Sequence, residues 1–238
     1  MRKIVHSAMA ASTIAVAASA WAADTQELSA KLNPDILSEL RTDEDLAGAP
    51  NATRGFGYSY SYEWTGKDPF KSKTAVTYER LPEKGFVLER GAYEEGDGYR
   101  RDMRTYFAAG GLLTILETGE VTQPGGKKKP SESHLSNYSI SGDLYPVAVG
   151  NKFSIKTEMT GTTDWELKEE CRVKRKLEAS SFDARFTGPA FYVDCRVDVT
   201  GGEPGTQDYY YIVELDFFLP DFRDSACSDC KDYRLTLN

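Results

Sequence analysis

The sequence predicts a mainly β fold: an antiparallel, strongly curved sheet, half-barrel or barrel-like, with a short N-terminal helix. The first reason is that apolar and polar residues alternate along many segments after Pro50. A period of two marks strands with one buried and one solvated face. The second is that no long helical pattern follows Pro50, so helical crossovers cannot join the strands and they must pair antiparallel. The third is a repeated cysteine tripeptide, described below.

The first 22 residues have the three parts of a secretory signal peptide. Arg2 and Lys3 precede an apolar run rich in Ala, and Ala20-Trp21-Ala22 has the small-x-small pattern of a cleavage site. The alternatives are a buried helix or a membrane anchor, but a spanning helix requires ~20 strongly apolar residues and this run contains many Ala, Ser and Thr. We expect cleavage after Ala22 and a periplasmic or secreted location, in a Gram-negative-type envelope. No later apolar stretch is long enough to span a membrane.

Residues 23–50 form a polar leader with one helical signal. Asn33 resembles an N-cap followed by a proline in the first turn, and Ile36, Leu37 and Leu40 fall on one side of a helix. This segment is either a short helix packed on the domain or a loose leader. Residues 51–238 are expected to form a single antiparallel β domain, a size that an all-β domain can reach.

Alternating segments with turn residues between them define the expected strands. They lie at 58–64, 76–79, 86–89, 153–159, 165–173, 191–199 and 209–219. The run Leu112–Leu116 is more continuously apolar than the other segments, which predicts cover on both sides. Residues 123–133 contain two glycines, two prolines and Lys127–Lys129, and they predict an exposed loop. The lysines are expected to be solvated, with contact to anionic lipid or cell wall as the alternative.

The tripeptide Cys-Arg-Val occurs at 171–173 and again at 195–197. If the two segments pair antiparallel with Cys171 opposite Cys195, the apolar residues of both fall on one face. A slip of one residue would place them on opposite faces. Directly opposed residues lie close enough for a disulfide, and the segment Leu177–Pro189 would then form a long connection.

Cys227 and Cys230 form a C-x-x-C pair near the C-terminus. A redox-active pair is one interpretation, but the motif does not follow a strand at a helix start and its acidic neighbours would raise a thiol pKa. A local disulfide fits an exported chain better. Zinc would require further ligands, and we expect no metal or other cofactor.

The segment from Leu144 to Cys195 resembles a pattern of exported and lipid-anchored bacterial proteins of unassigned function. It combines Leu144-Tyr145-Pro146-Val147-Ala148-Val149-Gly150 with an aromatic strand from Phe153, Trp165 and the two cysteines. Those proteins are similar to the curved-sheet, half-barrel carriers of the envelope. The resemblance implies a sheet-building pattern over residues 144–199 at most, and it carries no functional motif.

No catalytic signature stands out in the sequence. The motifs G-x-S-x-G and H-E-x-x-H are absent, and His134 would be the only histidine after cleavage, in a Ser-rich segment predicted to be a loop. Paired carboxylates for glycan hydrolysis remain open in an acidic β protein. The net charge of −8 becomes −10 when Arg2 and Lys3 are removed, which makes nucleic acid an unsuitable partner.

Aromatic residues at strand parity are the one feature above background. Core packing explains them, and so does an aromatic-lined concavity on a curved sheet. The candidate ligand contacts are Tyr58, Tyr60, Tyr62, Trp64, Tyr209 and Tyr211. We therefore expect a non-catalytic envelope protein that binds a lipid, glycan, peptide or other amphiphilic molecule. The alternatives are a hydrolase of envelope polymers, which a pocket with two close carboxylates would favour, and a structural or protein-interaction domain.

Overall fold

The structure is a computed structural model of the chain, and it describes residues 26–42, 57–64, 72–81, 85–95, 98–221 and 233–237. Within these ranges, the side chains of 57–64, 72–73, 95 and 233–237 are not described. The predicted signal peptide, residues 1–22, and the pair Cys227 and Cys230 lie outside the described residues. Those two predictions therefore stay predictions.

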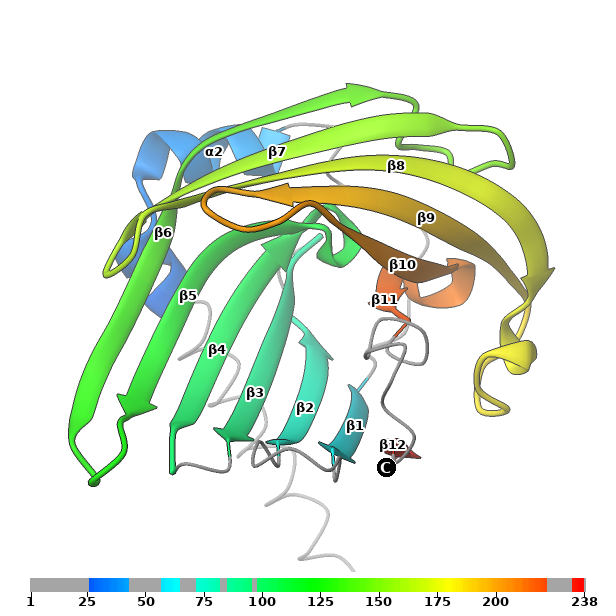
Figure 1. Cartoon of the computed structure of the whole chain (residues 1–238). Coiled ribbons are helices and arrows are strands. Elements are labelled where there is room, and N and C mark those ends of the chain that lie inside the picture. Colours follow the sequence, from blue (N-terminus) through cyan, green and yellow to red (C-terminus); the bar gives the residue numbers. More distant parts are fainter. Residues whose placement is uncertain are drawn as a thin grey trace, which may run out of the picture.

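The fold is one antiparallel sheet that curls strongly into a half-barrel (Figure 1). Its twelve strands follow the order β11-β10-β9-β8-β7-β6-β5-β4-β3-β2-β1-β12. Consecutive strands therefore lie side by side, and β12 returns to pair with β1. The strands are β1 (Gly57–Trp64), β2 (Ser72–Arg80), β3 (Val87–Glu95), β4 (Arg100–Ala108), β5 (Leu113–Thr122), β6 (Lys128–Gly142), β7 (Lys152–Gly161), β8 (Trp165–Glu178), β9 (Pro189–Val199), β10 (Gly205–Ile212), β11 (Phe217–Pro220) and β12 (Tyr233–Leu237). The predicted fold class is confirmed.

Short helical elements lie at the N-terminus and between strands. Residues 26–31 are helical, and α2 (Pro34–Thr42) follows. Asn33 caps α2, because its Oδ1 accepts a hydrogen bond of 2.9 Å from the backbone N–H of Asp35. Leu37 and Leu40 are buried in the core, so this part of the leader is a helix packed on the domain. Three 3-10 turns complete the description, η1 (Ala109–Gly111), η2 (Ala179–Ser181) and η3 (Val213–Leu215).

Strand β11 is covered on both faces because the sheet rolls over it. The ring of Phe217 lies 5.0 Å from that of Tyr78 on β2, at the other end of the sheet. Its neighbour Phe218 points the opposite way, toward Phe153 at 6.1 Å and Tyr211 at 4.6 Å. A strand buried on both sides needs apolar residues at both parities, and that is the pattern of residues 217–219.

Two segments differ from the strands and loops predicted above. Residues 209–219 form two strands rather than one, because the chain reverses through η3, where Asp216 has the left-handed φ of 47°. The loop predicted at 123–133 is wrong over most of its length, since β6 begins at Lys128 and pairs with β5. Lys128 is exposed and bonds Glu120 at 2.6 Å, and His134 lies within β6. The apolar run 112–116 is buried throughout, as predicted.

Candidate functional site

A disulfide between Cys171 and Cys195 holds strands β8 and β9 together. Cys171 lies opposite Cys195 in the β8–β9 pair, and their sulfurs are bonded with a Cα–Cα distance of 4.0 Å. Val173 lies opposite Val193, in the register that the repeated tripeptide predicts. Both cysteines are buried, so the bond fixes the position of β8 and β9 from within the core.

A hollow of about 560 Å³ lies on one face of the sheet, which we call the inner face. Its lining comes from strands as far apart as β3 and β8, five positions along the sheet. Side chains from strands so far apart can share one hollow only on the concave side of the curl. The aromatic and apolar part of the lining is Tyr93, Tyr99, Met103, Phe107, Val121 and Trp165.

A row of polar side chains crosses the inner face under this hollow. Tyr78, Glu89, Thr105, Glu117 and Ser133 oppose one another in sequence across β2 to β6. Glu89 is 9 % exposed, although Glu is almost never buried unless it is paired. A buried carboxyl without an ion pair is therefore the unusual feature of this wall.

Glu89 is held by phenols. Tyr93 donates a hydrogen bond of 2.7 Å to its Oε1, and the ring can fold back to reach it because Gly91 lies between them. A Cβ at Gly91 would lie 2.5 Å from the Tyr93 ring. Burial raises the pKa of Glu89, and the hydrogen bonds from Tyr93 and Tyr78 only partly oppose that rise. The guanidinium of Arg101 lies over the Tyr93 ring, 5.1 Å from its centroid.

Glu117 shares the hollow with Glu89. Burial raises the pKa of Glu117, and the neighbouring Glu89 carboxyl raises it further, while a hydrogen bond from Trp165 and the charge of Arg101 oppose the rise. Two strand spacings of ~4.8 Å place the Cα atoms of the two glutamates about 10 Å apart. Long side chains on one face at that separation can approach the same bound group.

A second buried carboxyl, Glu169, lies further along the inner face on β8, whereas Glu117 is half-buried. It is 2 % exposed and accepts a hydrogen bond of 2.6 Å from the hydroxyl of Tyr209 on β10. Burial raises the pKa of Glu169 to about 7 against the opposing effect of that bond. Among the described residues, no ion pair involves Glu89, Glu117 or Glu169.

Sequence reasoning missed these three glutamates. Glu169 has the same parity as Trp165, Leu167, Cys171 and Val173, so its position among inward residues was a signal for a buried carboxyl. Glu89 alternates with the apolar residues Phe86 and Leu88, a pattern that predicts a solvated side chain. In the structure Leu88 is itself buried in the core cluster that contains the leucines of the N-terminal helices, so both parities of β3 are covered there.

The aromatic residues predicted to contact a ligand lie in two separate parts of the structure. The backbone of Tyr58, Tyr60, Tyr62 and Trp64 lies in β1, and their side chains are outside the described atoms. Tyr209 and Tyr211 lie in the core. The hydroxyl of Tyr209 donates a hydrogen bond to Glu169, and that of Tyr211 donates a hydrogen bond of 2.8 Å to Asp216. Neither of them lines the inner hollow. Their hydroxyls donate hydrogen bonds to buried carboxyl groups, because a buried phenol needs a hydrogen-bond partner.

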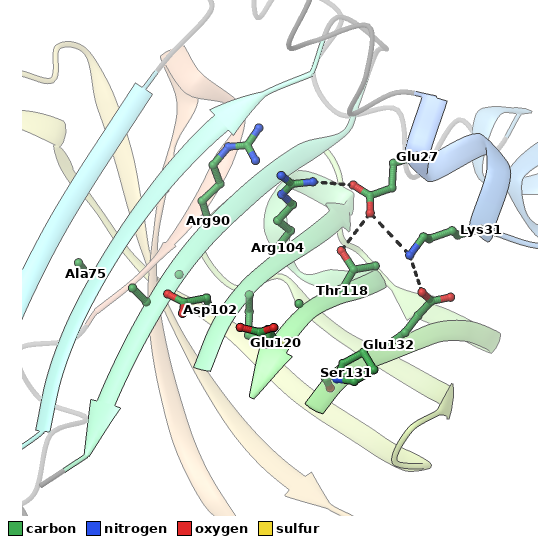
Figure 2. A pocket seen from close by; sticks show the side chains of 15 residues that line it. Glu27, Lys31, Ala75, Arg90, Asp102, Arg104, Thr118, Glu120, Ser131 and Glu132 are labelled. Carbon is green, nitrogen blue, oxygen red and sulfur yellow. Dashed lines mark hydrogen bonds and ion pairs between the residues drawn. The ribbon is translucent and has the colours of Figure 1, made fainter. Parts of the chain in front are cut away.

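A second hollow of about 670 Å³ lies on the opposite, outer face of β2 to β6, beside the N-terminal helix (Figure 2). Its charged groups are already paired. Glu27 accepts hydrogen bonds from Arg104 at 3.0 Å and Tyr106 at 2.9 Å, and Lys31 bonds Glu132. Burial acts to raise the pKa of Glu27, but these hydrogen bonds outweigh it and the pKa falls below its ordinary value. Such contacts fasten the helix to the sheet.

The chain matches no protein-family model, and it has no match among curated proteins. Over the residues that the structure describes, no helix is long and apolar enough to cross a membrane. The same residues contain no group of three or more His, Cys, Asp or Glu side chains that could hold a metal ion. The Nε2 atom of His134 lies 3.2 Å from the hydroxyl of Thr160, and His134 is not among the residues that line the inner hollow.

Proposed function

We propose that this chain is an exported, non-catalytic binding protein that holds an apolar or amphiphilic molecule in the inner hollow. The observation that carries the proposal is the lining of that hollow, where Tyr93, Met103, Phe107, Val121 and Trp165 of β3, β4, β5 and β8 lie among polar and charged side chains. Small-molecule sites combine aromatic and apolar side chains with polar groups that fix the orientation of the ligand. The signal-like leader and the similarity to half-barrel envelope carriers support a periplasmic or secreted location.

Apolar burial would supply most of the affinity. A covered methylene contributes ~0.8 kcal/mol, so a chain of ten carbons with half its length in the hollow gains about 4 kcal/mol before the cost of association. The polar row beneath the lining would then orient one end of the ligand. This division of work needs no nucleophile, metal or cofactor.

Uptake of an apolar dye tests the proposal. We expect N-phenyl-1-naphthylamine to bind with a rise in fluorescence, and a Val121→Trp variant, which fills the hollow at its rim, to bind at least about tenfold more weakly. Thr122→Trp places the same ring on the other face of β5 and is the matched control. Dye binding that is absent, or equal in both variants, would leave a structural or protein-interaction role as the better account.

A second candidate is a hydrolase of envelope glycans, favoured by the two carboxyls that share one hollow. Inverting and retaining glycosidases both use such a pair, one protonated and one ionised. Burial raises the pKa of both carboxyls, and Glu89 raises that of Glu117 further, while Trp165 and Arg101 partly oppose the rise at Glu117. Release of reducing ends from peptidoglycan, abolished by Glu89→Gln and by Glu117→Gln, would establish this activity. Release that is unchanged in both variants would come from a contaminant.

A further inference from the structure

We infer that the ligand of the inner hollow carries a protonated amine, held between the carboxyl groups of Glu89 and Glu117. This inference rests on the proposed function and names the chemical class of the ligand's polar end. It comes from three features of the wall: the convergence of two carboxyls, the neutral character of their present partners and the aromatic rings beside them.

The two carboxyls belong to one cross-strand row and lie two strands apart. They therefore point from the same face into the same hollow. They are close enough that the charge of one raises the proton affinity of the other. Thr105 lies between them in the row and is buried under them. A cationic group placed above Thr105 would contact both carboxyls and remove their mutual repulsion.

The hydrogen bonds that these carboxyls accept come from Tyr93, Tyr78 and Trp165, which are neutral donors. A buried carboxylate gains far more from a charged donor, because N⁺–H···O⁻ bonds are about twice as strong as neutral ones. An ammonium group offers three such donors. The wall is therefore complementary to a cation. Among the described residues, no cationic side chain forms an ion pair with either carboxyl.

The rings beside the carboxyls suit the same group. Tyr93, Tyr99 and Trp165 line the hollow, and aromatic faces attract cations. Arg101 already lies over the Tyr93 ring in this manner. Arg101 and Lys129 also line the hollow and would attract an anionic end group. However, Lys129 and Arg101 are both exposed, whereas Glu89 is buried, so the deepest charged group of the hollow favours a cation.

Three decyl compounds separate the contributions of tail and end group. Isothermal titration of the purified protein with decylamine, 1-decanol and decanoate at pH 7.5 compares a cationic, a neutral and an anionic end on one tail. We expect decylamine to bind roughly tenfold or more tightly than 1-decanol, and decanoate to bind most weakly. Decanol binding equal to decylamine, or tighter decanoate binding, would overturn this inference and leave the proposed function standing. Failure of all three to bind would overturn both.

Variants assign the preference to the two carboxyls. Glu117→Gln and Glu89→Gln keep acceptors for Trp165 and the phenols, so the wall should stay folded, and a thermal melt checks this. We expect each to lose most of the preference for decylamine while 1-decanol binds as before. Glu120→Gln, three residues from Glu117 on β5 and lining the outer hollow, is the control and should keep the preference. A preference retained in both inner variants would contradict the inference.

Discussion

Replacing Glu169 by glutamine should make the protein more stable, and more so as the pH rises. The carboxyl is 2 % exposed, has no ion pair, and its pKa in the fold is about 7 against an ordinary value of 4.5. Its folded-state pKa is raised, so the folded protein keeps a proton that the unfolded chain releases. The contribution to stability is therefore full below pH 4.5 and is lost progressively as the pH rises to about 7.

The magnitude follows from that difference. At about 1.36 kcal/mol for each pH unit between the two pKa values, the wild-type protein loses about 3 kcal/mol by pH 8.5 and about 1 kcal/mol by pH 5.5. Glutamine is neutral at both pH values and keeps an acceptor oxygen for the hydroxyl of Tyr209. Glu169→Gln should thus gain about 1 kcal/mol at pH 5.5 and about 3 kcal/mol at pH 8.5.

Urea unfolding at the two pH values measures the effect, with the disulfide intact throughout. Glu170→Gln is the control, because Glu170 is the next residue, points outward and pairs with Lys168 at 2.6 Å. Its loss should change the free energy of unfolding by less than about 0.5 kcal/mol at either pH. A Glu169→Gln gain that is absent at pH 8.5, or the same at both pH values, would refute the burial argument.

Two further changes test the architecture around the site. Cys171→Ala combined with Cys195→Ala should lower the free energy of unfolding by about 3 kcal/mol, because the bond closes a loop with a sequence separation of 24; a loss under about 1 kcal/mol would speak against it. Gly91→Ala should cost about 1–3 kcal/mol because its Cβ would meet the Tyr93 ring, whereas Gly205→Ala meets nothing within 4 Å. Equal melting temperatures for these two glycine variants would contradict the position of Tyr93.

The sequence predicts the sheet well where one face of a strand is wet. Phe153 to Met159 alternates with polar residues, and the buried parity in β7 is the predicted one. The repeated Cys-Arg-Val tripeptide predicts the β8–β9 register, because a one-residue slip would place the apolar residues on opposite faces and a disulfide needs Cys171 opposite Cys195. In such strands the period of two alone predicts which side chains face the core.

Prediction is weaker where the curl brings distant strands together. The pattern of residues 209–219 does not show that the chain turns at η3, since a strand covered on both faces has no wet parity to mark its ends. Glu89 looks like a solvated residue, but the phenol of Tyr93 folds back over Gly91 to bond it, and Trp165 of β8 lines the same hollow. The alternation of residues 86–89 contains neither contact. The polar wall thus results from the curvature of the sheet, which the alternation of residues along a single strand does not predict.

Native mass spectrometry of the protein purified without detergent tests the central claim most directly. If the inner hollow holds an amphiphilic molecule, the wild-type spectrum should contain a bound small molecule or should gain one when 1-decanol is added. The Val121→Trp variant should show much less of either, and Thr122→Trp should match the wild type. A spectrum of the ligand-free chain alone, with no uptake of 1-decanol by any of the three proteins, would contradict the account.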